Sequence, residues 1–238
     1  MAKRELPAFI ILWNKHKQLY MEVFSMALQE LSKRNFVSGD EDAISEILSL
    51  LLTQTCFNVG RIRGQEVRTP IWEGPIQPVS EQELKGGKTR KRPDFTCKCS
   101  NPWAYSPEDY EISLHVECKR LGINTSHSWN LNENYVINGI KRFDCKTHEY
   151  GKRSPSGMMI GYIISMIPKE IETEVNGYQR KRLSHCPDIA FTFDERTLFQ
   201  ARQQIQRRSI EPVQFELIHL WVDLRDKYHT SHVEVTQT

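Results

Sequence analysis

Two acidic residues and a lysine stand at the ends of two short apolar runs, and their types suit metal-assisted hydrolysis. Asp94 opens the run at residues 95–99, and Glu117 and Lys119 close the run that begins near residue 110. In a β-strand successive side chains alternate between faces, so Glu117 and Lys119 share one face. If the strand after Asp94 pairs beside them, two carboxylates and an ammonium group meet. Such a site suits a hard cation and the hydrolysis of a phosphodiester.

The runs around these residues have the patterns of strands. Residues 110–119 alternate apolar and polar, which predicts a strand with one face packed on a helical layer. The continuous apolar run at 158–167 predicts a strand buried on both faces. The catalytic candidates therefore lie at the end of a strand in a central sheet.

Helices are predicted on either side of these strands in the sequence. Residues 9–33 carry apolar side chains at intervals of mostly three and four, typical of an amphipathic helix that packs on a core. Dimerisation or DNA contact is the alternative role for this segment. A second helix begins after Ser38 or Asp40, either of which can cap it, and its acidic first turn complements the helix dipole.

The remaining elements complete the predicted order. Residues 57–70 alternate in a way that predicts a strand or hairpin, and 69–88 contain the prolines and glycines of a loop. A helix is expected from about Asn132. The C-terminal part is predicted to add a helix at 169–183, a strand at 189–193, a helix at 197–208 and a strand at 215–224.

In Pro93-Asp94 and Glu117-Cys118-Lys119 the chain resembles the PD-(D/E)xK nuclease superfamily. The agreement in element order covers residues 40 to 167, a little over half of the chain. The resemblance implies an α/β fold with a restriction-endonuclease-like core, a central mixed β-sheet flanked by helices in the order α-β-β-β-α-β. It implies a single nuclease domain over residues 1–238. Residues 38–167 would form the catalytic core, 1–37 a helical extension and 168–238 an α/β extension.

The resemblance also implies a role for each site residue. Asp94, Glu117 and the backbone carbonyl of Cys118 would hold Mg²⁺, and Glu46 would complete the outer shell from the preceding helix. Lys119 would help to deprotonate or orient the attacking water and would stabilise charge on the phosphorus. For Glu46, ordinary solvent exposure is an equally good explanation.

Basic residues near these positions predict contacts with nucleic acid. Four cations lie between residues 88 and 92, directly before Asp94, and a contact to phosphates explains that placement better than a solvated face does. For the cations on the helix after the site, a solvated face is nearly as good an explanation. The predicted nucleic-acid-binding residues are Lys88, Arg90, Lys91, Arg92, Arg120, Lys141 and Arg142.

Composition narrows the class of protein. With 238 residues, 39% hydrophobic content and a net charge of +2, we expect one domain with a local basic channel rather than a uniformly basic surface. Six cysteines and no signal-like apolar start indicate reduced thiols in the cytoplasm. No apolar run approaches the roughly 20 residues of a membrane-spanning helix. Cys97 and Cys99 lack the second close pair of cysteines that zinc sites commonly have.

The sequence therefore predicts a Mg²⁺-dependent DNA endonuclease, similar to type II restriction endonucleases or to nucleases of anti-phage defence. A homodimer is expected, since two symmetric sites cut both strands most simply, and a partner protein of a defence system is a further option. The alternatives are a DNA repair or junction-resolving nuclease of the same fold, a non-catalytic nucleic-acid-binding module, and a structural protein with a chance motif. Two neighbouring buried carboxylates argue against the binding module.

Overall fold

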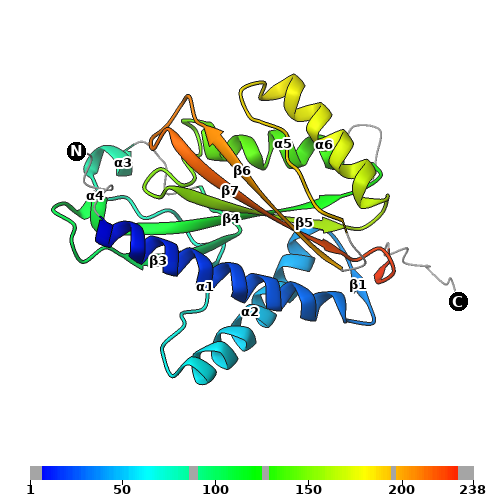
Figure 1. Ribbon diagram of the computed structural model, residues 1–238, viewed down its shortest axis with the longest axis horizontal. Coiled ribbons are helices and arrows are strands. Elements are labelled where there is room, and N and C mark those ends of the chain that lie inside the picture. The colour runs from blue at the N-terminus through cyan, green and yellow to red at the C-terminus, as the bar shows by residue number, and fades with distance from the viewer. Residues whose placement is uncertain (1–6, 86–90, 125–128, 194–196, 230–238) are drawn as a thin grey trace, which may run out of the picture.

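The computed structural model describes residues 7–85, 91–124, 129–193 and 197–229. A mixed sheet of six strands forms its centre, in the order β2-β3-β4-β5-β7-β6 (Figure 1). The strands are β2 (Ile71–Trp72), β3 (Phe95–Ser100), β4 (Glu111–Leu121), β5 (Ser156–Ile163), β6 (Leu198–Gln206) and β7 (Gln214–Asp223). The three central strands β4, β5 and β7 are parallel, and the pairs toward both edges are antiparallel. The predicted α/β class with a central mixed sheet is confirmed.

Helices cover both faces of this sheet, and each face buries its own apolar core. On one face lie α1 (Pro7–Ser32) and α2 (Glu41–Arg63). On the other lie α5 (Leu131–Ile137), a 3₁₀ turn (Ile140–Asp144) and α6 (Pro168–Arg182) (Figure 1). The short elements are α3 (Glu81–Lys85), α4 (Pro107–Tyr110) and the parallel pair β1 (Val37–Ser38) and β8 (Tyr228–His229).

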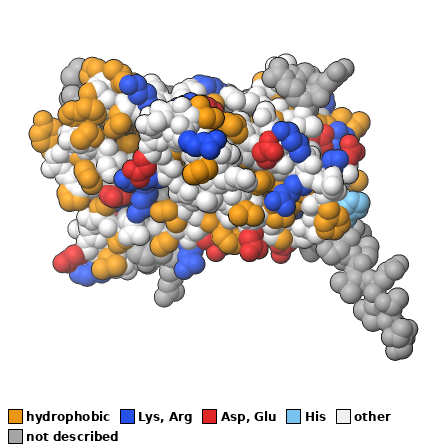
Figure 2. Space-filling view, turned by 90° about the horizontal axis from the view of Figure 1, so that it is seen from below, with side chains coloured by type: hydrophobic (Ala, Val, Ile, Leu, Met, Phe, Trp, Pro, Cys, Tyr) orange, Lys and Arg blue, Asp and Glu red, His pale blue; other side chains and the backbone are white. Residues whose placement is uncertain are grey.

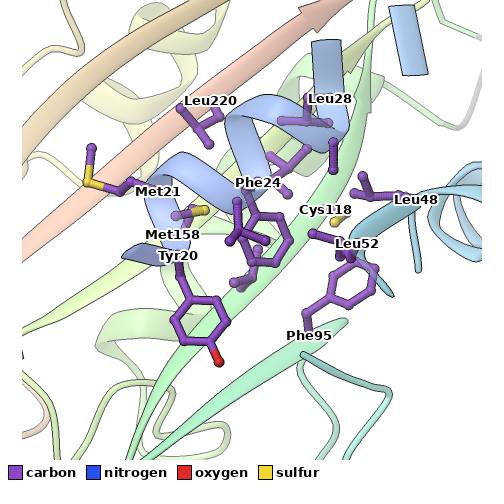
Figure 3. Close-up of a cluster of buried hydrophobic side chains, with 14 of the residues drawn as sticks. Tyr20, Met21, Phe24, Leu28, Leu48, Leu52, Phe95, Cys118, Met158 and Leu220 are labelled. Atoms are coloured by element: carbon purple, nitrogen blue, oxygen red, sulfur yellow. The ribbon is translucent and has the colours of Figure 1, made fainter. Parts of the chain in front are cut away.

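The core beneath α1 and α2 sets the orientation of the candidate site. Apolar side chains of both helices meet Phe95 and Cys118 of the sheet (Figure 3). Burying one large apolar side chain contributes about 1.5–3 kcal/mol, so this core strongly favours one register of β4. Because Cys118 points into the core, its neighbours Glu117 and Lys119 must point to the opposite face.

Helix α2 is long and apolar enough to cross a membrane by length and composition. One face of the helix is buried in the core, where Ile44, Leu48 and Leu52 are each 0% exposed, whereas Leu50, Phe57 and Ile62 are exposed. The predicted cap is confirmed, because the Asp40 side chain accepts a hydrogen bond from the backbone N–H of Ala43 at 3.0 Å. Packing against α1 and the sheet therefore accounts for the apolar residues on the buried face of this helix.

Some predicted elements differ in the structure. Residues 57–63 continue α2 instead of forming a strand, because the helix ends only at Gly64, whose φ of 62° is left-handed. The helix expected from Asn132 breaks near Gly139 into α5 and the 3₁₀ turn. Residues 189–193 form no strand.

The helix expected at residues 197–208 is wrong, since β6 occupies this segment. Its burial alternates from Phe199 on, with Phe199, Ala201, Gln203 and Ile205 buried and the residues between them exposed. Glutamine and arginine favour helices, so the segment was predicted as a helix although its buried residues recur at every second position, as in a strand. Hydrogen-bonded pairing with β7 along the whole strand outweighs this helical preference.

Candidate active site

The candidate site forms where β3 stops pairing with β4. Their ladder reaches no further along β4 than Val116. Two carboxylates take over the backbone N–H groups beyond that point. Asp94 Oδ2 accepts from the N–H of Cys118 at 2.5 Å, and Glu41 Oε2 accepts from the N–H of Arg120 at 3.2 Å. The end of β4 is thus bordered by acidic side chains in place of a neighbouring strand.

Lys119 links the acidic side chains to one another. Its Nζ donates to Glu41 Oε1 at 2.6 Å, to Glu117 Oε1 at 2.8 Å and to the carbonyl of Cys118 at 2.6 Å. Burial alone would lower the pKa of Lys119, but the charges of Glu117 and Glu41 outweigh it and raise that pKa above its ordinary value. Lys119 is therefore a fixed cation that keeps its proton and donates hydrogen bonds.

The carboxylates carry an excess of buried negative charge. Burial, followed by the charge of Glu117, raises the pKa of Asp94 to about 8, and burial also raises the pKa of Glu41. Glu117 is fully buried, and among the described residues its Oε2 has no hydrogen-bond partner. An additional positive charge would therefore be favoured here.

The donor set fits a hard divalent cation. Asp94, Glu117 and the Cys118 carbonyl offer only oxygen atoms, which Mg²⁺ prefers, and the unpartnered Glu117 Oε2 is a free ligand. No cluster of three or more His, Cys, Asp or Glu side chains suited to a metal occurs in the described parts of the chain. Such a cluster is not required, because Mg²⁺ usually keeps several waters and binds through one or two carboxylates.

Arg142 approaches the site from the 3₁₀ turn on the same face of the sheet. Its Nη1 donates to Glu117 Oε1, the oxygen that also accepts from Lys119. The Arg142 side chain is 26% exposed. Burial would lower the pKa of this guanidinium, but the charge of Glu117 raises it above its ordinary value. Arg142 therefore adds a second permanent cation beside the carboxylates.

A buried arginine anchors the backbone that presents Arg142. Arg207 is 2% exposed and donates to the carbonyls of Phe143 at 3.1 Å, Tyr150 at 3.3 Å and Gly151 at 3.2 Å. Its guanidinium carbon lies 4.0 Å from the centre of the Phe215 ring. No residue-type pattern marks Arg207 in the sequence, because its partners include three backbone carbonyls that are 56 to 64 residues away in the chain.

A groove of about 470 Å³ lies beside these groups. Three cations, Lys119, Arg120 and Arg142, line it together with three acids, Asp40, Glu41 and Asp42. Trp129 in its wall is 50% exposed. Cationic side chains contact phosphates, and an exposed aromatic ring can stack on a base. The groove therefore offers the kinds of group that contact a nucleic-acid strand.

The structure brings together Asp94, Glu117 and Lys119, the three predicted catalytic residues. The carboxylate expected from the helix comes from Glu41 rather than Glu46, whose side chain is exposed. Five residues advance a helix by about 7.5 Å and place the two side chains about 140° apart around its axis, so the two positions do not share a face. The prediction attributed Glu41 to the helix dipole alone, which concealed its second role.

The predicted basic residues divide between the groove and the surface. Arg120 lines the groove, and its Nη1 also donates to the Tyr228 hydroxyl at 3.2 Å and lies 3.5 Å from the carbonyl of Gly39. Arg142 lines the groove as well, whereas its neighbour Lys141 is exposed and contributes nothing to the groove lining.

The basic run before Asp94 is placed only in part. Lys91 is half-buried and Arg92 is exposed, while Lys88 and Arg90 lie outside the described residues. On the side where α2 lies, basic and acidic side chains are interspersed with apolar ones (Figure 2). This mixture matches the small net charge of the chain.

Comparison of the chain with protein-family models, curated proteins and solved structures finds no match.

Proposed function

We propose that this protein is a Mg²⁺-dependent DNA endonuclease with a restriction-endonuclease-like core. The observation that carries the proposal is the meeting of Asp94, Glu117 and Lys119 at the point where β3 leaves β4. Asp94 is half-buried and Glu117 is fully buried, and burial together with their mutual repulsion raises the pKa of Asp94 and destabilises the folded protein. A domain that only binds nucleic acid has no use for such a pair. Metal-assisted hydrolysis gives both of them a use.

Each residue of the site has a chemical task in this function. Asp94, Glu117 and the Cys118 carbonyl would hold Mg²⁺, which when bound supplies a hydroxide at neutral pH and offsets the charge of the scissile phosphate. Lys119 keeps its proton on Nζ, and its charge stabilises the negative charge that develops on the phosphate oxygens. The N–H group that donates to Glu117 would orient the attacking water when a metal takes that carboxylate. Glu41 fixes Nζ from the other side and so holds Lys119 in place. Cys118 packs its side chain in the core and is not a nucleophile.

DNA is the proposed substrate because the groove beside the site combines three cations with an exposed tryptophan. The biological setting we propose is restriction or anti-phage defence in the cytoplasm, with a homodimer cutting the two strands. A DNA repair or junction-resolving nuclease would use the same chemistry. Substrate structure separates the two, since a resolving enzyme would cut branched DNA in preference to linear duplex.

The test is cleavage of plasmid and phage DNA with Mg²⁺ by the wild type and by Asp94→Ala and Lys119→Ala. Loss of a charge-stabilising group at the reacting centre is expected to slow cleavage by about 100-fold or more. Glu170→Ala and Lys181→Ala remove one charge each from exposed positions on α6, outside the groove lining, and are expected to cut at the wild-type rate. Discrete fragments would support a sequence-specific enzyme, and a smear a nonspecific one.

Two outcomes would contradict the proposal. If Asp94→Ala and Lys119→Ala cut as fast as the wild type, the reaction takes place elsewhere. If the wild type binds DNA but leaves it intact with Mg²⁺ and with Mn²⁺, on linear, supercoiled and branched substrates alike, the protein is a binding module.

A further inference from the structure

Arg142 makes only half of the ion pair that a guanidinium and a carboxylate can form. The planar fork of arginine can meet both oxygens of a carboxylate. Here a single nitrogen, Nη1, donates to Glu117 Oε1. Among the described residues, Arg142 Nε and Glu117 Oε2 are both buried without a hydrogen-bond partner. Buried polar groups almost always have a hydrogen-bond partner, so these two atoms indicate that other partners bind here when the protein carries out its reaction.

The two unpaired atoms call for partners of opposite charge. Glu117 Oε2 is an acceptor that lacks a cation, and Arg142 Nε is a donor that lacks an anion. A divalent cation together with a phosphodiester supplies both. Glu117 Oε1 is already shared between Lys119 and Arg142, so a cation that binds the Glu117 carboxylate competes with them.

We propose that Arg142 is a two-position latch of the active site. In the free protein its Nη1 donates a hydrogen bond to Glu117 Oε1. When a divalent cation binds Glu117 and Asp94, the Arg142 side chain leaves Glu117 and donates to a non-bridging oxygen of the DNA phosphate. The inference rests on the proposed function and adds to it a residue that both restrains metal binding and contacts the reacting group.

The surroundings of Arg142 allow its side chain to move while its backbone stays in place. Arg207 holds the carbonyl of the next residue, Phe143, and the Tyr150 N–H donates to the Arg142 carbonyl at 3.3 Å. The Arg142 side chain is 26% exposed and lines the groove, so a phosphate there can reach it. Lys119 differs, because it is 9% exposed and held by three oxygens. The movable cation at this site is thus Arg142.

Such a latch affects metal binding and cleavage in opposite directions. Removing a cation that competes for Glu117 is expected to tighten Mg²⁺ or Mn²⁺ binding about tenfold. Removing the donor to the phosphate is expected to slow cleavage about 100-fold at saturating metal. A merely structural arginine would weaken metal binding and slow cleavage together.

The experiment compares the wild type with Arg142→Ala in two separate assays. Binding of Mn²⁺ is measured by calorimetry without DNA, and cleavage of plasmid DNA is measured at saturating Mg²⁺. The control Lys181→Ala removes the same charge from an exposed position on α6, outside the groove lining, and is expected to change neither quantity. If Arg142→Ala does not fold, Arg142→Met keeps the aliphatic stem and replaces it in both assays.

Tighter Mn²⁺ binding together with slower cleavage would support the latch. Unchanged or weaker Mn²⁺ binding by the Arg142 variant would overturn it, and so would cleavage at the wild-type rate by a variant with tighter binding. A wild type that cuts no DNA while Arg142→Ala still binds Mn²⁺ more tightly would refute the nuclease proposal and the phosphate contact, but not the competition for Glu117.

Discussion

Replacing Asp94 with asparagine is expected to stabilise the metal-free protein, and the gain is expected to grow with pH. In the folded protein, burial and then the charge of Glu117 raise the pKa of Asp94 from its ordinary 3.8 to about 8. Below pH 3.8 the folded and unfolded states both keep this proton, and the raised pKa has no cost. Between pH 3.8 and 8 the folded state binds more protons than the unfolded state. The free energy of unfolding therefore falls as the pH rises through that window.

The magnitude follows from the width of this window. One proton changes the free energy of unfolding by about 1.4 kcal/mol per pH unit. The raised pKa of Asp94 therefore lowers the free energy of unfolding at pH 7 by at most about 4 kcal/mol. We expect about half of that, because Asp94 is only half-buried and solvent screens part of its charge. Asparagine removes the charge and can still accept the hydrogen bond from the Cys118 N–H. The variant is therefore expected to be about 2 kcal/mol more stable at pH 7.

The assay is urea denaturation of the wild type and Asp94→Asn between pH 4 and 8 with a chelator present. The two free energies of unfolding are expected to coincide near pH 4 and to diverge as the pH rises. Asp42→Asn, at an exposed position on α2, is expected to stay within about 0.5 kcal/mol of the wild type throughout. Excess Mg²⁺ is expected to stabilise the wild type and so to reduce the difference in free energy of unfolding between it and Asp94→Asn. A gain that does not vary with pH, or a variant less stable at pH 7, would refute the reasoning.

Two further predictions concern residues that support the site. Glu41→Gln is expected to slow DNA cleavage about tenfold, because Lys119 loses a charged hydrogen-bond partner. The control Glu46→Gln, at an exposed position, is expected to leave the rate unchanged. Equal rates for the two variants would show that Glu41 does not position Lys119. Arg207→Met is expected to lower the free energy of unfolding, measured by urea denaturation, by about 3 kcal/mol, because buried carbonyls lose their hydrogen-bond donor. The control Arg208→Met, at an exposed position, is expected to change it by less than about 0.5 kcal/mol. Similar losses in both variants would contradict this account.

The central part of the site could be predicted from sequence because it depends on short-range geometry. Alternation along β4 places Glu117 and Lys119 on one face, and that follows from residue order alone. Asp94 precedes β3 directly, so antiparallel pairing of β3 with β4 brings it close to Glu117. The apolar residues of β4, including Cys118, then decide which face of the sheet carries the chemistry.

The remaining parts depend on contacts that sequence patterns do not specify. The apolar stripe of α2 predicts which face packs on the core, but not which end of the helix reaches β4, so Glu46 was predicted in place of Glu41. The strand β6 was predicted as a helix, because its edge position and its pairing with β7 are properties of the assembled sheet. Arg207 recognises carbonyl groups of a distant loop, which leave no residue-type pattern to find.

The end of β3 shows why this location suits a reactive site. A strand that continued beside β4 would occupy the N–H groups of Cys118 and Arg120 with its own carbonyls, and no acidic side chain could lie there. Because β3 stops pairing, Asp94 and Glu41 take those N–H groups, and the same carboxylates are thereby fixed around Lys119. The backbone bonds orient the acids, and the acids hold the lysine. Extending the β3–β4 ladder by two residues would therefore abolish the site while leaving both apolar cores intact.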